Sequence, residues 1–326
     1  MTKTLQIISI FVICSVTISA QSSLQNHTVN YDCYVTGNPH DVKVKTTPGL
    51  GLQGGGGDED AMMRFLISKA KGGDFLVLRT SGSDGYNDYV WDFGGVDSVT
   101  TLVIKNKEAS KDPFVISTIR NAEVIFFSGG DQSKYQQLWQ NTEIQRLILH
   151  KFANGTPMGG TSAGAMIMSE YFFTARNGSV YSDEMLDDPY NRYATLDKNF
   201  LSLVEGVIID THFRERDRMG RLVGFLARIA TDWKKKSKAI ALQTNTAIFI
   251  EADNNVRVYA PPGEHVYFVK PDGLPEHCKS QDALTYREIS VCKITQGTFN
   301  LKTWQGDGDV YRFSAIEGRL FPKSPY

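Results

Sequence analysis

The stretch with the clearest chemical potential is Gly160-Thr161-Ser162-Ala163-Gly164, which lies between a short apolar run and an apolar helical pattern. A serine on a sharp strand-to-helix turn has a crowded backbone, and glycines two residues away on either side leave room for it. Such a turn presents the hydroxyl as a nucleophile, and the N–H of Ala163 points to where an oxyanion would form. The alternative is a glycine-rich loop that packs a helix tightly against a strand, and the motif alone does not separate the two.

A second candidate stretch is Ser128-Gly129-Gly130-Asp131-Gln132, which ends the apolar run Val124–Phe127 and opens a helical pattern. The exposed N–H of Gly130 is a candidate second oxyanion donor beside Ala163. Gln132 is a candidate hydrogen-bond partner for a substrate amide or carboxylate, with helix capping as the alternative.

A third candidate stretch runs from Asp210 to Leu222, directly after the apolar run Gly206–Ile209. Among the six histidines, His212 stands out because it follows an apolar strand and precedes dense charge. A serine nucleophile needs a base, and His212 is predicted at the correct edge of the sheet. The crowded arginines beyond it form either a carboxylate clamp or a solvated helix face, and they are Arg216, Arg218 and Arg221.

The glycine run Gly54–Gly57 follows the apolar run Leu50–Gln53. It has no Gly-Lys-Ser/Thr sequence after it, so it is not a P-loop. Two interpretations stay open, a cradle for an anion at a helix N-terminus and a tight turn that lets a helix pack on the sheet.

Apolar strand patterns alternate with helical patterns from about residue 50 to residue 230, which predicts a mostly parallel sheet with helices on both faces. The predicted helices include Asp60–Ala70, Lys134–Phe152 and Arg216–Ile229. After Ala239 the strands follow one another closely, separated by turns. The sequence therefore predicts an α/β fold, a doubly wound, mostly parallel sheet with a β-rich C-terminal extension.

The chain divides into four predicted segments. Residues 1–20 have a positive start, a short apolar run and small residues before Gln21, which is typical of a secretory signal peptide. Residues 21–45 are either a flexible lead-in or an edge attachment, residues 46–270 form the α/β domain, and residues 271–326 form a β-rich module. We therefore expect a secreted protein, and three glycosylation sequons fit that route, at Asn26, Asn154 and Asn177.

Charge and cysteine usage restrict the partners. The formal net charge of −1 predicts no nucleic-acid partner and no membrane association after signal cleavage. Without Cys14 of the signal segment, three cysteines remain, and Cys278–Cys292 is the preferred disulfide. No C-x-x-C spacing is present, so a cysteine-based zinc site is not expected. We predict no metal and no cofactor. Whether the chain forms a homodimer is left open.

The three motifs in this order and spacing closely resemble the cyanophycinase branch of the cyanophycinase and dipeptidase E serine peptidases, over about residues 48–270. The resemblance implies a flavodoxin-like fold similar to class I glutamine amidotransferases, with serine in place of cysteine. It implies cleavage beside aspartyl residues, including the isopeptide bond of β-Asp-Arg peptides, so the expected partner is a small acidic or β-aspartyl peptide. By this likeness Ser162 is the nucleophile and His212 the base. The remaining implied roles are an oxyanion hole at Gly130 and Ala163, and substrate binding by Gln132, Thr211, Arg216, Arg218 and Arg221.

Two positions depart from the family pattern. The family's acidic triad residue lies in an Asp-Glu-x-Thr-Ala stretch, and Thr244 occupies its position here. Loss of a triad acid costs on the order of 10⁴-fold in turnover. Three alternatives stay open. The threonine hydroxyl could orient His212, or another acid, Glu251 or Asp210, could take the place of the missing carboxylate. Alternatively, the chain is an extracellular binding protein that has lost most activity. Thr211 stands where cyanophycinases carry glutamine, which leaves the exact substrate open.

Overall fold

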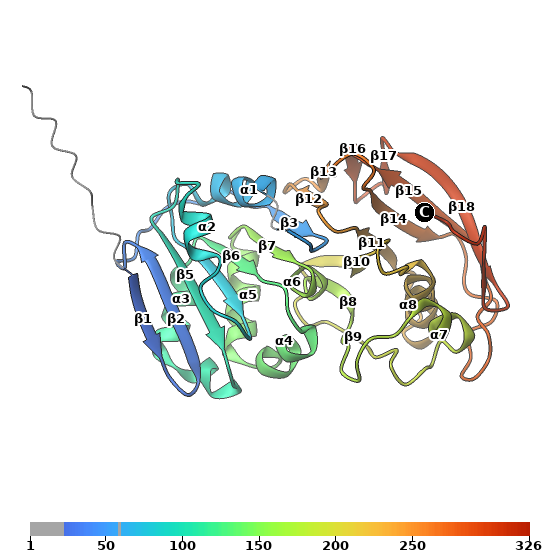
Figure 1. Cartoon of the computed structure of the whole chain (residues 1–326), viewed down its shortest axis with the longest axis horizontal. Helices are drawn as coiled ribbons and strands as arrows, with labels where there is room; N and C mark the ends of the chain where they lie inside the picture. The colour runs from blue at the N-terminus through green and yellow to red at the C-terminus, as the bar shows by residue number, and fades with distance from the viewer. Residues whose placement is uncertain (1–22, 58–59) are drawn as a thin grey trace, which may run out of the picture.

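Two β-sheets and the helices around them make up the computed structural model, which describes residues 23–57 and 60–326 (Figure 1). Across the first sheet the strands run in the order β1 (Ser23–His27), β2 (Tyr31–Gly37), β5 (Ser98–Ile104), β4 (Phe75–Arg79), β6 (Val124–Phe127), β7 (Met158–Thr161), β3 (Leu50–Gln53), β12 (Ala247–Ile250), β13 (Asn255–Tyr259), β16 (Gln296–Asn300) and β17 (Gln305–Gly306). The central strands β5, β4, β6, β7 and β3 are parallel, and antiparallel strands extend the sheet on both sides.

The second sheet also has a parallel centre. Its order is β19 (Arg319–Phe321), β18 (Asp309–Ile316), β15 (Tyr286–Ile294), β14 (Val266–Pro271), β11 (Lys238–Leu242), β10 (Val204–Asp210), β8 (Ser169–Phe173) and β9 (Leu196–Lys198). Strands β8, β10 and β11 are parallel, and the others are antiparallel to their neighbours. Buried side chains from both sheets share one core cluster, which includes Leu52 and Met158 of the first and Ile209 and Leu242 of the second.

Helices cover both faces of the first sheet, because its central strands are apolar on both sides. On β4, Leu76 and Leu78 join the cluster that packs on α3 and α5, whereas Phe75 and Val77 join the cluster that packs on α1. The helices are α1 (Asp60–Ala70), α2 (Asn87–Trp91), the 3₁₀ turn η1 (Lys107–Lys111), α3 (Pro113–Asn121), α4 (Gln132–Trp139), α5 (Glu143–Ala153), α6 (Ala163–Met166), α7 (Ser182–Asp187) and α8 (Met219–Asp232). The predicted α/β fold with a mostly parallel central sheet and a β-rich C-terminal region is confirmed.

Element boundaries differ from the sequence prediction at two places, and the structure decides between the two alternatives for the N-terminal segment. The predicted helix Lys134–Phe152 is two helices, α4 and α5, because Asn141 has a left-handed backbone (φ 59°) between them. Helix α8 begins at Met219 and not at Arg216, because Asp217 is also left-handed (φ 47°). Residues 23–37 form the hairpin β1–β2, which pairs with the edge of β5, so the edge-attachment alternative fits this segment and the flexible lead-in does not.

The C-terminal strands continue the two sheets and do not form a separate module. The predicted boundary at residue 270 falls inside β14, which pairs with β11 on one side and β15 on the other. Strand β16 then returns to the first sheet beside β13. The C-terminal residues therefore help hold the two sheets together.

The predicted Cys278–Cys292 disulfide is wrong in this structure, because both thiols are free and buried. Cys278 packs with α8 in one core cluster, and Cys292 lies on β15 in the other cluster. On β15 the neighbour Val291 belongs to the same cluster as Cys278, so Cys292 points to the opposite face. Cys33 is also free and buried.

The prediction of a secreted protein rests on the first twenty residues and on three surface sequons. The predicted signal peptide, residues 1–20, lies outside the described residues. Among the residues that are described, no helix has the length and apolarity needed to cross a membrane. The three sequon asparagines, Asn26, Asn154 and Asn177, are all exposed, and their glycosylation stays a prediction.

Candidate active site

Ser162 occupies the sharp turn that the glycine spacing predicts. Its backbone has φ 53° and ψ −121°, a conformation that costs on the order of 1–3 kcal/mol for a residue with a side chain. A Cβ at Gly160 would lie 2.6 Å from the Gly164 backbone, and a Cβ at Gly164 would lie 2.1 Å from the Phe127 carbonyl oxygen. Only glycine fits both positions, so the tight strand–turn–helix connection depends on them.

His212 contacts Ser162 directly. The distance between Ser162 Oγ and His212 Nε2 is 2.8 Å, a hydrogen bond in which the tautomer decides the donor. Ser162 follows β7 of the first sheet, and His212 follows β10 of the second, so the pair joins the carboxyl ends of two sheets. The predicted serine–histidine contact is present, but the two residues come from the carboxyl ends of two different sheets and not from one sheet edge.

The glycine run after β3, Gly54–Gly57, packs against His212. The N–H of His212 donates to the Gly54 carbonyl at 2.9 Å, and a Cβ on Gly55 would lie 2.4 Å from the imidazole. Gly55 has φ +94°, a backbone that favours glycine. The tight-turn interpretation of this run therefore fits the structure, with the turn packing on a side chain of the site.

The surroundings of His212 keep its ring neutral. Burial, followed by the positive charges of Arg216 and Arg218, lowers the pKa of His212 to about 4, although Asp210 acts in the opposite direction. A neutral imidazole at pH 7 can accept the proton of a serine hydroxyl.

Backbone donors flank the serine hydroxyl. Ala163 is the first residue of α6, so its N–H has no partner within the helix. The turn at Gly129 and Gly130 passes beside the serine, since a Cβ on Gly129 would lie 3.5 Å from Ser162 Cβ. Gly130 itself has φ +144°, with open space where a side chain would stand. Both predicted oxyanion donors, Gly130 and Ala163, thus lie in segments that border Ser162.

Two of the three predicted substrate-binding arginines are structural, which corrects the sequence interpretation. Arg221 is 2% exposed and donates to both carboxylate oxygens of Asp210, at 2.5 and 2.8 Å. Arg218 is also buried and donates to the Thr211 carbonyl at 2.5 Å and to Asp210 at 3.4 Å. Because Asp210 is fully buried, its charge needs these partners, and the two arginines are not available to a substrate.

Three further residues were predicted to contact substrate, and one of them is buried. Thr211 is fully buried and its hydroxyl has no hydrogen-bond partner among the described residues, so its assignment as a substrate contact is wrong in this conformation. Arg216 is exposed, and its charge acts on His212. Gln132 is the first residue of α4, is half-buried and donates to the Phe173 carbonyl at 3.3 Å. Gln132 and Arg216 remain candidates.

The position of the missing acid holds an arrangement that the sequence did not suggest. The Thr244 backbone N–H donates to Glu215 Oε1 at 3.0 Å, and the same oxygen lies 3.7 Å from His212 Nδ1. No hydrogen bond between the Thr244 hydroxyl and His212 is found among the described residues. The family pattern does not single out Glu215, which lies only three residues after His212.

The two acids suggested from the sequence are engaged elsewhere. Glu251 follows β12 and pairs with Lys69 of α1 at 2.5 Å. Asp210 is held by Arg218 and Arg221. Neither carboxylate therefore replaces the missing acid.

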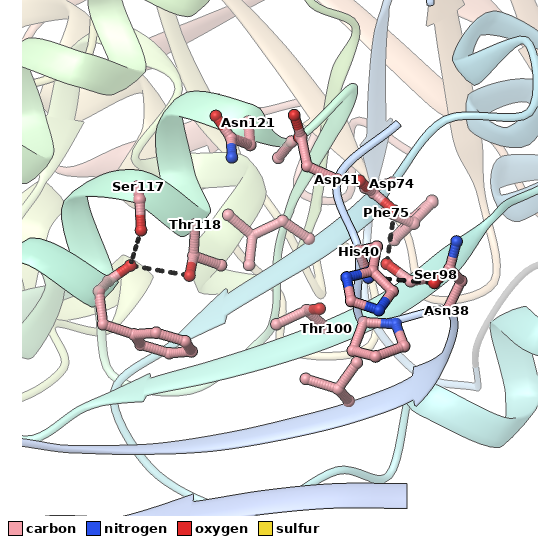
Figure 2. Close-up of a pocket in the computed structure, with 15 residues that line it drawn as sticks. Asn38, His40, Asp41, Asp74, Phe75, Ser98, Thr100, Ser117, Thr118 and Asn121 are labelled. Carbon is pink, nitrogen blue, oxygen red and sulfur yellow. Dashed lines mark hydrogen bonds between the residues drawn. The ribbon is translucent and has the colours of Figure 1, made fainter. Parts of the chain in front are cut away.

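Two cavities lie at the opposite edge of the sheets. The first has a volume of about 190 Å³ and is lined by Asp74, Ser98 and His40, among others, at the amino ends of β4 and β5 (Figure 2). A second cavity, of about 820 Å³, is lined by Leu50, Lys238 and other residues at the amino ends of β3 and β11. Ligands of parallel sheets gather at the carboxyl ends, where Ser162 lies, so neither cavity belongs to this site. Within the described part of the chain, no group of three or more His, Cys, Asp or Glu residues could hold a metal ion.

The α/β fold, with Ser162 on a strand–turn–helix and His212 in contact with it, is typical of serine hydrolases. A model of peptidase family S51 matches residues 90–258. The chain belongs to peptidase family S51, which confirms the resemblance drawn from the three motifs.

Individual relatives agree with this assignment. The chain is 26% identical over 226 residues to a cyanophycinase of Synechococcus elongatus, covering 68% of this chain and 65% of that one. It is 30% identical over 208 residues to a cyanophycinase of Trichormus variabilis, covering 62% of this chain and 65% of that one. The chain thus spans less than two thirds of the length of these relatives.

A solved structure supports the fold. The crystal structure of a peptidase from an acI-B1 Actinobacterium is 20% identical, covers 69% of this chain and 91% of that chain, and has a TM-score of 0.50. At this identity the likeness concerns the fold alone.

Proposed function

We propose that this chain is a secreted serine peptidase that cleaves β-aspartyl or other Asp-adjacent peptide bonds through an acyl-enzyme. The observation that carries the proposal is the 2.8 Å contact between Ser162 Oγ and His212 Nε2 on a strained turn. Membership of peptidase family S51 supports peptide-bond hydrolysis.

The proposed reaction uses the two residues in sequence. His212 Nε2 takes the Ser162 hydroxyl proton as Oγ attacks the substrate carbonyl, and the N–H groups of Ala163 and Gly130 bind the resulting oxyanion. His212 then gives its proton to the leaving amine, which releases the first product and leaves the acyl group on Ser162. Water, deprotonated by His212, hydrolyses the ester.

The proposed substrate is acidic. Exposed Arg216 supplies a positive charge near the histidine, and a guanidinium fork suits a carboxylate. The cyanophycinase relatives point in the same direction. Arg218 and Arg221 do not contribute, because Asp210 neutralises them in the interior.

A peptide-release assay tests this proposal. The panel contains β-Asp-Arg, β-Asp-Lys and the α-Asp isomers, with Ser162→Ala as the control variant. We expect release of the amine product from at least one aspartyl peptide by the native chain and none by Ser162→Ala. Equal release by both proteins, or none by a folded native chain, contradicts the proposal.

A binding protein without turnover is the second candidate, favoured by Thr244 at the position of the family's acid. It predicts that the same peptides bind in calorimetry and remain intact through long incubation. Measurable turnover that depends on Ser162 excludes it.

A further inference from the structure

We propose that Glu215 is the positioning residue of His212, the carboxylate that acts at Nδ1 in place of the acid that Thr244 cannot supply. The inference rests on the proposed function, since it assigns a third member to the same serine–histidine pair. None of the sequence motifs assigns this role to Glu215.

The geometry places one carboxylate oxygen between two nitrogen atoms. Glu215 Oε1 lies 3.7 Å from His212 Nδ1 and accepts the Thr244 N–H at 3.0 Å. Thr244 thus contributes its backbone, and its N–H anchors the same carboxylate oxygen that lies near the histidine. Among the described residues, Glu215 is the acid found within 4.0 Å of a His212 ring nitrogen.

The backbone on both sides of the pair is fixed. His212 donates its N–H to Gly54, and Arg218 donates its N–H to the Phe213 carbonyl at 2.9 Å, which closes the turn that carries Glu215. Phe213 is fully buried against Tyr267. The turn between His212 and Arg218 is therefore held at both ends, and the Glu215 side chain reaches back over the histidine.

The chemistry of the proposed reaction requires such an acceptor. If Nε2 is to take the serine proton, Nδ1 must carry the ring proton already, and an acceptor at Nδ1 selects this tautomer. The imidazolium formed in the transition state is disfavoured by burial and by Arg216, Arg218 and Arg221. Asp210 faces the same region, but its carboxylate is bound to two of those arginines. Glu215 supplies the remaining negative charge at the correct nitrogen.

The proton balance leaves Glu215 ionised throughout. The serine proton moves to Nε2 and from there to the leaving amine, while the proton on Nδ1 stays on the ring and points to Oε1. At 3.7 Å the contact is longer than a hydrogen bond, and catalytic hydrogen bonds are often long before substrate binds. A closure of less than ~1 Å by the side chain, which is 31% exposed, gives a full hydrogen bond.

The test compares Glu215→Gln and Glu215→Asp with the native chain and with Glu205→Gln, which removes an exposed charge at the far end of β10. We expect Glu215→Gln to lower kcat roughly 10- to 10³-fold, less than the ~10⁴-fold of a buried triad acid, because water can partly replace an exposed carboxylate. KM should stay within about threefold, since the residue acts through His212. Glu215→Asp should fall between the native chain and Glu215→Gln, and Glu205→Gln should match the native chain.

A second measurement keeps the inference separate from the proposed function. Nitrogen NMR of the His212 ring reports its tautomer without turnover, and we expect the Nδ1–H form in the native chain and a mixed population in Glu215→Gln. Unchanged kcat, a raised KM with unchanged kcat, or an identical tautomer in both proteins overturns the inference. An inactive native chain whose tautomer still depends on Glu215 instead contradicts the proposed function and supports the positioning role.

Discussion

At the residue scale, the candidate site joins three side chains from two short segments, Ser162, His212 and Glu215. Ser162 and His212 could be predicted from the sequence because each follows an apolar strand in a distinctive motif. The roles of the arginines could not be predicted, because their spacing does not reveal that buried Asp210 lies between Arg218 and Arg221. Glu215 also escaped prediction, since its contact with His212 depends on a left-handed turn at His212 (φ 46°) and Asp217.

The lowered pKa of His212 predicts the acid limb of the activity profile. A base must be neutral to act, and burial with neighbouring arginines lowers the pKa of His212 to about 4. We therefore expect kcat/KM to rise with pH around 4 to 5 and to be level by pH 6.5, where an ordinary histidine would be half protonated. The measurement is kcat/KM from pH 3.5 to 8 on one released peptide. A midpoint near 6.5 would show that the ring is not desolvated as described.

At the element scale, the site is built where the chain crosses between the two sheets. The parallel strands around β4 were predictable from continuous apolar runs, and so was α1. The division into two sheets was not, because strand pairing is a long-range choice that apolar runs do not encode. The turn after β3 contacts His212 only because β3, early in the chain, pairs with β7 and β12.

Gly55→Ala tests this turn as the support for the histidine. A Cβ there would stand 2.4 Å from the imidazole, so the ring must move, and displacements of about 1 Å can cost on the order of 10²-fold in rate. Kinetics and thermal unfolding of the purified variant give the two readouts. We expect lower kcat in a folded protein.

Gly72→Ala is the matched control. Gly72 has a similar backbone (φ +85°) but open space around the added Cβ, so it shares the backbone cost of about 1–3 kcal/mol without touching the site. Activity that falls equally in both variants would mean that backbone strain, and not displacement of His212, explains the loss.

At the scale of the whole molecule, the carboxyl and amino ends of the parallel strands carry different groups of residues. The carboxyl edge holds Ser162 and His212, and the amino edge holds two neighbouring acids, half-buried Asp74 and buried Glu123, next to the cavity in Figure 2. Glu123 accepts the Asp74 N–H at 2.9 Å, and burial raises the pKa of Glu123 to about 7. This edge therefore affects the stability of the fold without contact with the site.

Glu123→Gln should stabilise the protein at neutral to alkaline pH. Between about pH 4.5 and 7 the folded state binds more protons at Glu123 than the unfolded state, so its contribution to stability falls as pH rises through that window. We expect the variant to be more stable than the native chain by ~1–2 kcal/mol at pH 8 and equal to it near pH 4.5. Urea unfolding at both pH values measures this, and a difference that is the same at both would contradict the assignment.

The proposed function depends above all on Ser162, activated by His212, attacking a carbonyl. The most direct test is labelling with a fluorophosphonate, followed by mass spectrometry of the intact protein and of its peptides, with Ser162→Ala and His212→Ala as controls. We expect one adduct per chain, located on Ser162, absent in Ser162→Ala and formed much more slowly in His212→Ala. A folded native chain that gains no adduct, or a Ser162→Ala variant that gains as much as the native chain, would show that Ser162 is not an activated nucleophile.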